Sequence, residues 1–299
     1  MRYLLLYNPV SGKGKFHKKI DFIKKQFENR NLHLDVYPSK KANDLNEKAY
    51  LEAGNYDYLI VSGGDGSINE VINGIMRSEY RPKFAIMPSG TANDSAAILG
   101  INKNVRRTLK LIFQDNPVKI DINKINDKYF FYTTAAGVLT KISYDISRRK
   151  LKKYGYIAYL TEGAKDLINK YNMKMTIKHD GGTLVNEYIL VLGLSAKRVG
   201  GMYLTGFTNA KMNDGLLELR LIPYNKKFRT ARVLGFFINR GRKNKNHDAL
   251  VSSRFEISTT NNVVWNVDGE RGAKGSVVIT VLKEELDVIA SKRAIKQYF

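Results

Sequence analysis

A cluster of glycines around one acid is the feature of the sequence best suited to chemistry. Tyr58–Val61 is an apolar run typical of a buried strand, Gly63–Ser67 reads Gly-Gly-Asp-Gly-Ser, and helical spacing of apolar residues follows. A glycine turn that leads into a helix offers backbone N–H groups to phosphate, and Asp65 inside it could hold a cation or a polar group of the ligand. An ordinary tight turn is the alternative, but Asn69 and Glu70 in the first helical turn favour a ligand site.

Two further polar loops follow predicted strands. Asn8–Gly12 reads Asn-Pro-Val-Ser-Gly and has two lysines close behind it, and Pro88–Asp94 reads Pro-Ser-Gly-Thr-Ala-Asn-Asp. Asn93 or Asp94 could cap the helix that comes next. Each loop alone is as well explained by a solvated turn. Because ligands bind at the carboxyl ends of strands in open α/β sheets, we expect all three loops to converge on one site.

The elements that must position these loops change in character along the chain. Up to Ile120, strand-like and helix-like segments alternate, which predicts an α/β sheet with flanking helices. After Ile120, strand-like segments dominate and predict a β-sandwich or barrel. The expected later strands are Tyr129–Val138, Met173–Ile177, Leu184–Leu194, Leu216–Ile222, Phe255–Ser258, Val263–Val267, Val277–Leu282 and Leu286–Ala290, and the expected later helices are Tyr156–Tyr171 and Phe228–Gly241.

Composition restricts the classes of function. The chain has 299 residues, 43% of them hydrophobic, and a formal net charge of +22, which favours a polyanionic partner such as nucleic acid, an anionic membrane or a phosphorylated ligand. Cysteine is absent, and the four histidines do not have metal-ligand spacing, so a zinc enzyme is not expected. No signal peptide or membrane span is recognisable, and we expect a cytoplasmic protein with at most peripheral membrane contact.

Two basic stretches could provide that contact. Lys141–Lys153 and Tyr224–Asn246 are rich in Lys and Arg, and the second contains no acid. Such stretches are most often solvated surface. Aromatic residues beside them, among them Phe236 and Phe237, suit docking on the anionic inner face of a membrane. No motif that reads RNA or DNA accompanies them, so nucleic acid is not an expected partner.

The three loops together carry a family resemblance. An early Asn-Pro-x-Ser-Gly, then Gly-Gly-Asp-Gly-Ser-x-Asn-Glu, then Pro-x-Gly-Thr-Ala-Asn-Asp resembles the bacterial diacylglycerol kinase and YegS-like lipid kinase family, over nearly the whole chain. NAD kinases and phosphofructokinases carry related glycine-aspartate loops. The resemblance implies an NAD kinase/phosphofructokinase-like α/β domain at 1–122, completed by 288–299, and a β-sandwich lipid-substrate domain at 123–287.

The resemblance also implies site residues. Those lining the ATP site are Asn8, Ser11, Ser39, Gly64, Asp65, Gly66, Ser67, Asn69, Glu70 and Thr91, and the same loops contain Pro9, Gly12, Gly63, Gly90 and Asn93. Ser39 stands where the family usually has Thr. Asp65 would help to hold Mg²⁺ between phosphate oxygens. In the late turn Val267–Gly272, Glu270 corresponds to the family's general base.

A second Mg²⁺ site is implied at Lys211–Leu216, which by itself reads as a hairpin turn. In similar enzymes an Asp here binds a structural Mg²⁺, so Asp214 would supply a carboxylate, and Lys211 and Leu216 would supply carbonyl oxygens.

The sequence therefore predicts an ATP-dependent lipid kinase of phospholipid biosynthesis that phosphorylates a lipid hydroxyl, diacylglycerol first among the candidates, to give phosphatidate. An NAD kinase-like enzyme with a soluble acceptor is the first alternative, and a basic nucleic-acid-binding protein without catalysis is the second. Sphingoid bases, undecaprenol and phosphatidylglycerol remain open as acceptors. A homodimer is compatible with the sequence.

Overall fold

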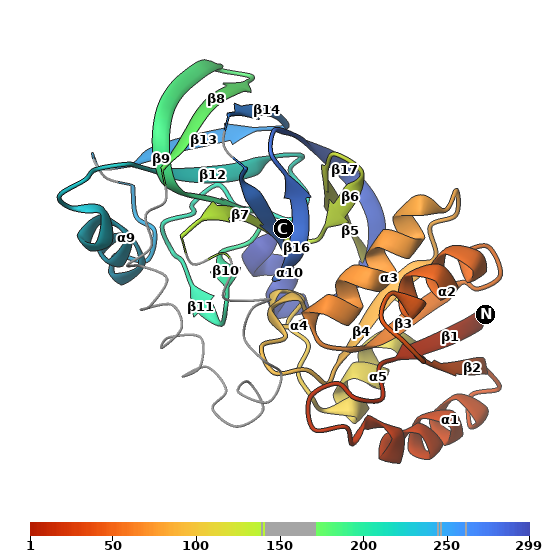
Figure 1. Cartoon of the computed structure of the whole chain (residues 1–299). Coiled ribbons are helices and arrows are strands. Elements are labelled where there is room, and N and C mark those ends of the chain that lie inside the picture. The colour runs from red at the N-terminus through yellow and green to blue at the C-terminus, as the bar shows by residue number, and fades with distance from the viewer. Residues whose placement is uncertain (139, 141–171, 244, 246, 261) are drawn as a thin grey trace. The chain divides into compact units, whose positions relative to one another are not determined.

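The structure is a computed structural model that describes residues 1–138, 140, 172–243, 245, 247–260 and 262–299 (Figure 1). The chain forms two compact units. Unit 1 consists of Met1–Asp121 and Glu284–Phe299, and unit 2 consists of Ile122–Lys283. The sequence had placed these boundaries after residues 122 and 287. The predicted helix Tyr156–Tyr171 and the basic stretch Lys141–Lys153 lie outside the described residues.

Unit 1 is a parallel sheet with helices on both faces. Strand order in the sheet is β17-β4-β3-β1-β2. The elements are β1 (Arg2–Tyr7), a 3₁₀ helix η1 (Phe16–Lys19), α1 (Ile20–Glu28), β2 (His33–Pro38), α2 (Asp44–Glu52), β3 (Tyr58–Gly63), α3 (Asp65–Arg77), β4 (Lys83–Pro88), α4 (Asp94–Ile98), α5 (Val105–Gln114), the start of β5 (Pro117–Ile125), the end of β17 (Val277–Ile289) and α10 (Lys292–Tyr298).

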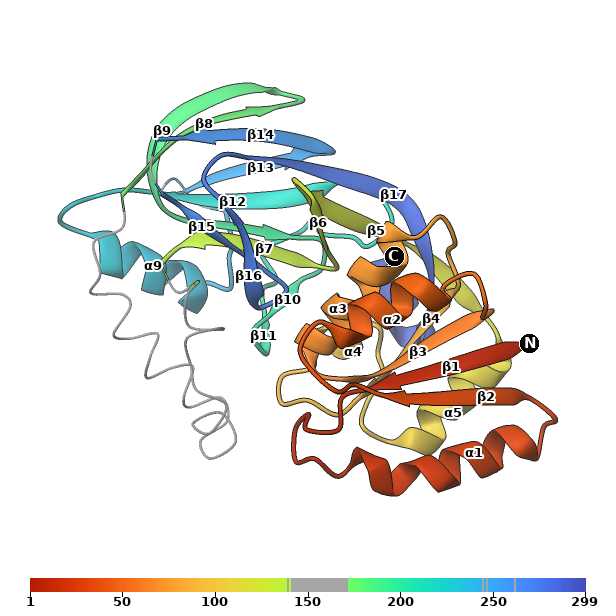
Figure 2. The same ribbon diagram turned by 45° about the vertical axis from the view of Figure 1, so that its right-hand side comes forward.

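The core of unit 1 follows from its apolar strands. Every residue of β3 is buried, as expected of a parallel strand that helices cover on both faces. Helices α1 and α5 lie on one face of the sheet and α2 and α3 on the other (Figure 2). Tyr3 pairs with Tyr58 in the register of β1 and β3, and their rings stack with centroids 4.8 Å apart.

Unit 2 is rich in antiparallel sheet. Its strands run in the order β16-β15-β7-β9-β8-β14-β17, with β12 also paired to β9 and to β13. Its elements are β6 (Lys128–Phe130), β7 (Thr133–Gly137), β8 (Met173–His179), β9 (Gly182–Leu194), β10 (Arg198–Val199), β11 (Met202–Tyr203), β12 (Leu217–Pro223), α9 (Arg229–Ile238), β13 (Asp248–Ser252), β14 (Arg254–Thr259), β15 (Val264–Val267) and β16 (Glu270–Lys274), together with the end of β5 and the start of β17.

The α/β N-terminal region and the sheet-rich C-terminal region agree with the sequence prediction, but two strand assignments were wrong. The expected single strand at 129–138 is two strands, because the backbone N–H groups of Phe131 and Tyr132 donate to the Asp268 carboxylate instead of to a neighbouring strand. The strand expected at 286–290 is the end of β17 and not a separate element. Within the described residues, no helix is long and apolar enough to span a bilayer.

Candidate functional site

The three polar loops of unit 1 meet at the carboxyl ends of adjacent parallel strands. β3 pairs with β1 on one side and with β4 on the other. The Asn8 side-chain amide donates to the Ser67 hydroxyl at 3.3 Å. The backbone N–H groups of Ser89 and Gly90 both donate to the Gly63 carbonyl, at 2.9 and 3.1 Å. Segments far apart in the sequence are therefore joined directly, as the loop pattern predicted.

Glycine is required where these loops touch. A Cβ on Gly90 would lie 2.4 Å from the Gly64 Cα, and a Cβ on Gly12 would lie 1.9 Å from the Ser89 carbonyl oxygen. Real Cβ atoms do not come that close to backbone. Gly12 also has φ of +56°, which L-residues rarely adopt. The loops thus approach one another through bare backbone, and a side chain at Gly12 or Gly90 would force them apart.

Helix α3 begins directly at the glycine turn. Gly64 is its N-cap residue and has no side chain to cap the first-turn N–H groups. The sequence placed Asp65 and Gly66 in the turn, whereas both belong to the first turn of α3. Uncapped N–H groups and the positive end of the helix dipole favour a phosphate group at this position.

Asp65 contacts the next loop rather than open space. Its Oδ1 accepts hydrogen bonds from the backbone N–H of Ser95 at 3.0 Å and from the Ser95 hydroxyl at 2.9 Å, and its Oδ2 accepts from the Asp94 N–H at 3.3 Å. Burial raises the pKa of the Asp65 carboxyl, although the Ser95 bonds oppose that shift. As the sequence predicted, Asn93 occupies the N-cap position of α4, but its side chain makes no capping bond, and the Asp65 carboxylate accepts the Asp94 and Ser95 N–H groups instead.

Asn93 has a different role in its loop. Its φ is +54°, and its side-chain N–H donates to the Gly90 carbonyl at 2.8 Å. Its buried Oδ1 has no hydrogen-bond partner within the described residues. A buried amide oxygen without a partner is costly, and a donor group of a bound ligand would satisfy it.

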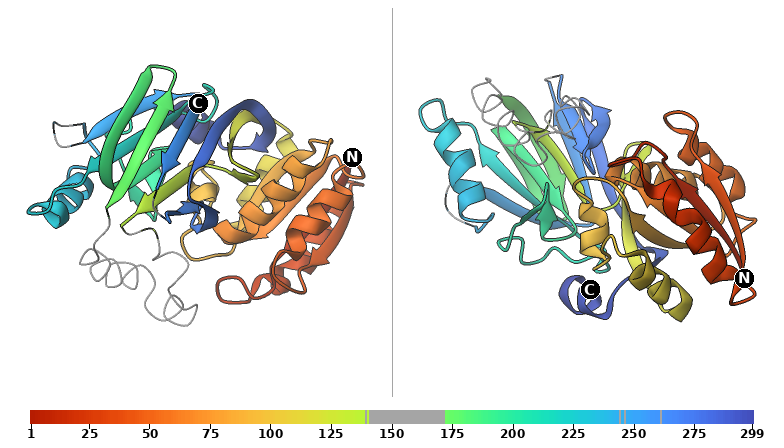
Figure 3. Two further views of the ribbon diagram at one scale, coloured as in Figure 1. Left: turned by 45° about the horizontal axis from the view of Figure 1, so that its top comes forward. Right: turned by 90° about the horizontal axis from the view of Figure 1, so that it is seen from below.

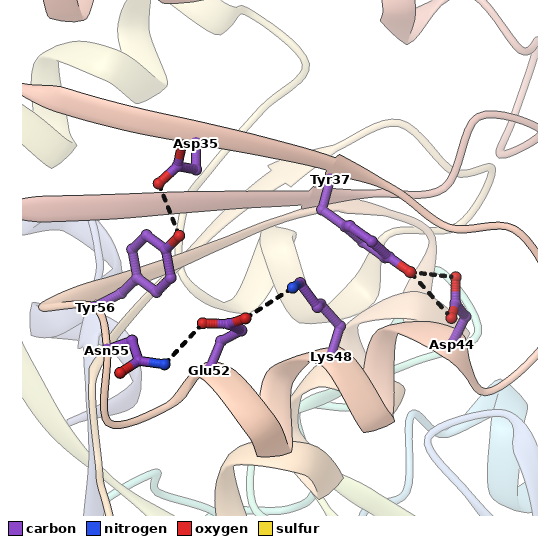
Figure 4. Close-up of polar contacts among 7 residues, drawn as sticks. All are labelled: Asp35, Tyr37, Asp44, Lys48, Glu52, Asn55 and Tyr56. Carbon is purple, nitrogen blue, oxygen red and sulfur yellow. Dashed lines mark hydrogen bonds and ion pairs between the residues drawn. The ribbon is translucent and has the colours of Figure 1, made fainter.

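The segment after β2 carries Ser39, which lies beside the first loop. The Ser39 backbone N–H donates to the Tyr7 carbonyl at 2.8 Å. Asp44, at the start of α2, accepts bonds from the Tyr37 hydroxyl and from the Lys40 N–H at 2.7 Å. The segment is therefore held on both sides of Ser39, by the Tyr37–Asp44 contact before it, which Figure 4 shows, and by the Lys40–Asp44 bond after it.

Two further polar contacts, which the sequence did not predict, lie nearby: one joins β2 to the chain before β3, and the other lies within α2. Tyr56 donates to Asp35 at 2.7 Å, and Glu52 pairs with Lys48 at 2.7 Å (Figure 4). Burial, together with the Asp35 bond, raises the pKa of Tyr56 to about 12.

Glu70 and Asn69 lie one turn into α3. The Glu70 carboxylate accepts a bond from the Asn43 N–H at 3.2 Å, and the Asn69 side-chain oxygen accepts one from Asn73 at 3.1 Å. Thr91, at the tip of the third loop, is exposed. Glu70 therefore holds the beginning of α2, in addition to any contact with a ligand.

In unit 2, Glu270 follows a tight hairpin turn. Asp268 and Gly269 have φ of +48° and +91°, and Glu270 opens β16 opposite Val267. The Glu270 side chain is exposed. An Asp-Gly pair with positive φ at both residues is the favoured two-residue hairpin turn, so the local sequence explains this geometry.

Asp268 is a structural residue that sequence reasoning treated only as part of the turn. Its buried carboxylate accepts backbone bonds from Phe131 at 2.6 Å, Tyr132 at 3.0 Å and Thr133 at 3.1 Å. Its own N–H donates to the Thr133 carbonyl at 3.0 Å. The side chain thereby fixes the hairpin, and with it Glu270, against the chain before β7.

Asp214 lies in the turn before β12 and is half buried. Its Oδ1 accepts the Leu216 N–H at 3.0 Å. Burial raises the pKa of the carboxyl, and the positive charges of Lys211 and Lys283 act in the opposite direction. Three or more His, Cys, Asp or Glu side chains gathered as a metal site are not found within the described residues, so a cation at Asp214 would depend on main-chain oxygens.

A buried ion pair, also missed from the sequence, supports the chain leading to Asp214. Glu218 and Arg220 are almost fully buried and lie 2.5 Å apart. Glu218 accepts the Asn209 N–H at 3.0 Å, and Arg220 donates to the Gly206 carbonyl at 2.6 Å. Alternating polar residues in a strand usually face solvent, so no sequence pattern indicates that these two face the core.

A cavity of about 580 Å³ lies between α1 and α5, away from these loops. Its lining residues are Phe22, Gln26, Arg30, Arg106, Leu109, Lys110, Phe113 and Gln114. None of the predicted site residues is among them, so this cavity is not the expected nucleotide site.

The comparisons with known proteins agree with the loop geometry. The diacylglycerol kinase catalytic domain profile matches residues 2–125. A diacylglycerol kinase of Staphylococcus aureus (strain bovine RF122 / ET3-1) is 31% identical over 295 residues, which cover 97% of this chain and 92% of the relative. The chain belongs to the bacterial diacylglycerol kinase family. As a member of that family it is a lipid kinase.

Solved structures give the fold of the same kinase family. A protein of Bacillus anthracis str. Sterne described as a candidate diacylglycerol kinase aligns with a TM-score of 0.84 at 24% identity, covering 98% of this chain and 96% of its own. A diacylglycerol kinase of the same organism aligns with a TM-score of 0.75 at 22% identity and covers 98% of both chains. The two-unit fold is thus that of the family.

Proposed function

We propose that this lipid kinase transfers the γ-phosphate of ATP to the free hydroxyl of diacylglycerol, giving phosphatidate for phospholipid synthesis. The observation that carries the proposal is the direct joining of the Asn8, Gly63 and Ser89 loops beside the uncapped start of α3. The triphosphate would lie on the first-turn N–H groups of α3, and Asn93 Oδ1, which has no hydrogen-bond partner among the described residues, would accept a donor of the nucleotide.

Glu270 would act as the general base. Phosphoryl transfer asks the protein mainly to align the reactants and to neutralise charge, with one residue orienting the nucleophile. The acceptor hydroxyl gives its proton to the Glu270 carboxylate while its oxygen bonds to the γ-phosphorus. The bond from that phosphorus to the bridging oxygen breaks, and ADP leaves with the electron pair.

Two carboxylates of this chain, Asp65 and Asp214, are candidates for contact with Mg²⁺, and Asp214 is the better suited to direct ligation. Burial disfavours the charged form of both Asp65 and Asp214, and a bound cation would offset that cost. Asp65 already accepts three hydrogen bonds, so it has little capacity left for direct ligation. Asp214, with the carbonyl oxygens of Lys211 and Leu216, would hold a structural ion. When bound beside the phosphates, Mg²⁺ supplies charge neutralisation.

The acceptor stays in a bilayer, so we place the enzyme in the cytoplasm at the inner face of the membrane. The test is a phosphorylation assay with labelled ATP and Mg²⁺ on mixed micelles of diacylglycerol, a sphingoid base, undecaprenol or phosphatidylglycerol, and on NAD in solution, with products identified by mass spectrometry. We expect phosphatidate as the main product. A labelled product from another lipid would refute diacylglycerol as acceptor, and labelled NADP alone would refute the lipid kinase assignment for this chain.

A further inference from the structure

Helix α9 in unit 2 has one buried face and one exposed apolar face. Val233 and Phe236 are buried, and the Phe236 ring meets the rings of Phe207 and His247 edge-on, with centroids 6.3 and 5.3 Å away. On the other face, Leu234 is 45% exposed and Ile238 78% exposed. The first face explains why the helix packs on unit 2, whereas Leu234 and Ile238 on the second face are not buried by the residues that the structure describes.

The exposed apolar face is continuous and open. Ala231, Leu234 and Ile238 are spaced by three and four residues, which places them on one stripe of the helix. Phe228, directly before α9, is 60% exposed. A Cβ built on Gly235 would have no heavy atom within 4 Å. Exposed apolar side chains that cluster in this way mark an interaction surface.

Positive charge borders this stripe at both ends. The exposed cations are Lys226 and Lys227 before the helix, and Arg240, Arg242, Lys243 and Lys245 after it. No Asp or Glu occurs between Tyr224 and Asn246. Figure 3 shows α9, in cyan, at the margin of unit 2.

The sequence analysis expected Phe236 and Phe237 to be available for membrane docking, and the structure differs on both. Phe236 is 2% exposed and belongs to the core, and Phe237 is half buried. The apolar groups available to a partner are instead Phe228, Leu234 and Ile238. A solvated face is the plain alternative, but solvated helical faces are polar, whereas the exposed stripe here is apolar and only its ends are charged.

An anionic membrane is the partner that fits this pattern. The exposed apolar side chains of the helix suit the acyl boundary of a bilayer, and the Lys and Arg residues at both of its ends suit the phosphate headgroups. The net charge of +22 adds attraction to such a surface.

We propose that α9, with the flanking residues 226–228 and the cations Arg240, Arg242, Lys243 and Lys245, is the helix that docks this kinase on anionic phospholipid. Leu234 and Ile238 enter the acyl boundary, and the cations contact lipid phosphates. This inference deepens the proposed function, because it names the surface through which a bilayer-resident acceptor is reached, and it rests on that function for its purpose.

The experiment compares the full-length protein with three variants by co-sedimentation with vesicles. The docking variant carries Leu234→Gln and Ile238→Gln, the charge variant carries Lys227→Gln and Arg242→Gln, and the matched control carries Val185→Gln. Val185 is 75% exposed on β9 in the same unit. The vesicles are phosphatidylcholine alone, or phosphatidylcholine with phosphatidylglycerol, at low and high salt.

We expect the unaltered protein to bind the phosphatidylglycerol vesicles and to release at high salt. The affinity of the docking variant for these vesicles should fall by at least about tenfold, since two apolar side chains no longer enter the acyl boundary. The charge variant should lose affinity for anionic vesicles only, and Val185→Gln should bind normally. Equal melting temperatures and gel-filtration volumes for all four proteins would show that only the membrane contact has changed.

Three results would overturn the inference. The first is full vesicle binding by the docking variant, and the second is a loss of vesicle affinity in the Val185→Gln control equal to that of the docking variant. The third is a change of oligomeric state in the docking variant, which would mean that a second copy of the chain covers α9. Activity on short-chain diacylglycerol in solution separates this inference from the proposed function. The docking variant should keep it, whereas an unaltered protein that binds vesicles but phosphorylates no diacylglycerol would refute only the proposed function.

Discussion

The Asp65 carboxylate, at the start of α3, accepts both the backbone N–H and the hydroxyl of Ser95 in α4. An acid of the glycine-rich turn therefore serves as the cap of the helix that follows the third loop. The glycine-rich turn and the third loop are coupled through this side chain, so a substitution in α4 should alter the stability of the glycine-rich turn.

Replacing Ser95 tests that coupling. Ser95→Ala removes the hydroxyl bond but leaves the backbone bond to Asp65, so we expect a loss of about 1.5–3 kcal/mol in the free energy of unfolding, as for a hydrogen bond to a charged group. Urea unfolding followed by circular dichroism measures it. An unchanged midpoint would mean that the hydroxyl bond contributes nothing.

The contact between Gly64 and Gly90 predicts unequal effects of the same substitution. A Cβ on Gly90 would lie 2.4 Å from the Gly64 Cα, but a Cβ on Gly64 would lie 3.5 Å from the Gly90 Cα. Gly90→Ala should cost about 2–3 kcal/mol, because backbone cannot move aside, while Gly64→Ala should cost under about 1 kcal/mol. Thermal melts of Gly90→Ala and Gly64→Ala measure this difference. Similar melting temperatures for the two variants would contradict the prediction.

Asp268 should matter for stability as well as for activity. Asp268→Asn replaces an acceptor of three backbone N–H groups with a group that offers one oxygen, and we expect a loss of about 2–4 kcal/mol. Asp127→Asn, at an exposed position, is the control and should change little. Guanidinium unfolding of both variants measures the two losses. Equal unfolding midpoints would show that the Asp268 carboxylate does not stabilise the fold.

Glu270→Gln should leave the fold intact and reduce the turnover number. The side chain is exposed, so melting should be unaffected, whereas losing the general base should slow lipid phosphorylation about 10²- to 10⁴-fold. Initial rates with labelled ATP and a melting curve on the same preparation measure both effects. Turnover equal to that of the unaltered enzyme would exclude Glu270 as the base.

His247 should make the protein sensitive to acid. Burial, together with the charge of Arg220, lowers the pKa of this imidazole, so the folded state keeps it neutral at a pH where the unfolded chain takes up a proton. Stability is therefore fully present above about pH 6.5 and falls as pH drops towards the folded pKa, by at most about 1.4 kcal/mol per pH unit.

The corresponding variant is His247→Gln. Its melting temperature should fall less between pH 7 and pH 5 than that of the unaltered protein, whatever the difference between the two at pH 7. Differential scanning calorimetry across this range gives both slopes, and parallel slopes would show that His247 does not carry the acid sensitivity.

Much of unit 1 could be predicted because its signals are local. The apolar run of β3 and the glycine turn after it lie next to each other in the sequence, and the loops meet because parallel strands end at one edge. The cap of α4 could not be found in this way. Local rules assign the cap to Asn93 or Asp94, whereas the group that makes the bonds is Asp65, about thirty residues earlier.

Unit 2 was predicted in outline only, since its decisive contacts join distant segments. The break between β6 and β7 depends on Asp268, whose bond to Phe131 spans 137 positions of the chain. The buried pair of Glu218 and Arg220 looks, in sequence, like the solvent-facing side of a strand. On α9, helical spacing alone could not decide whether Phe236 or Ile238 faces the core, because apolar residues lie on both sides of the helix.

The closing of unit 1 by the end of β17 has a consequence during synthesis. Glu284, with φ of +52°, donates its N–H to the buried Asp121 carboxylate at 2.8 Å, across 163 positions of the chain. A ribosome that has finished the first 121 residues must still translate those 163 before the sheet receives its last strand, which takes roughly 10–30 s. Unit 1, although most of it is made first, can complete its sheet only after the end of β17 has been synthesised.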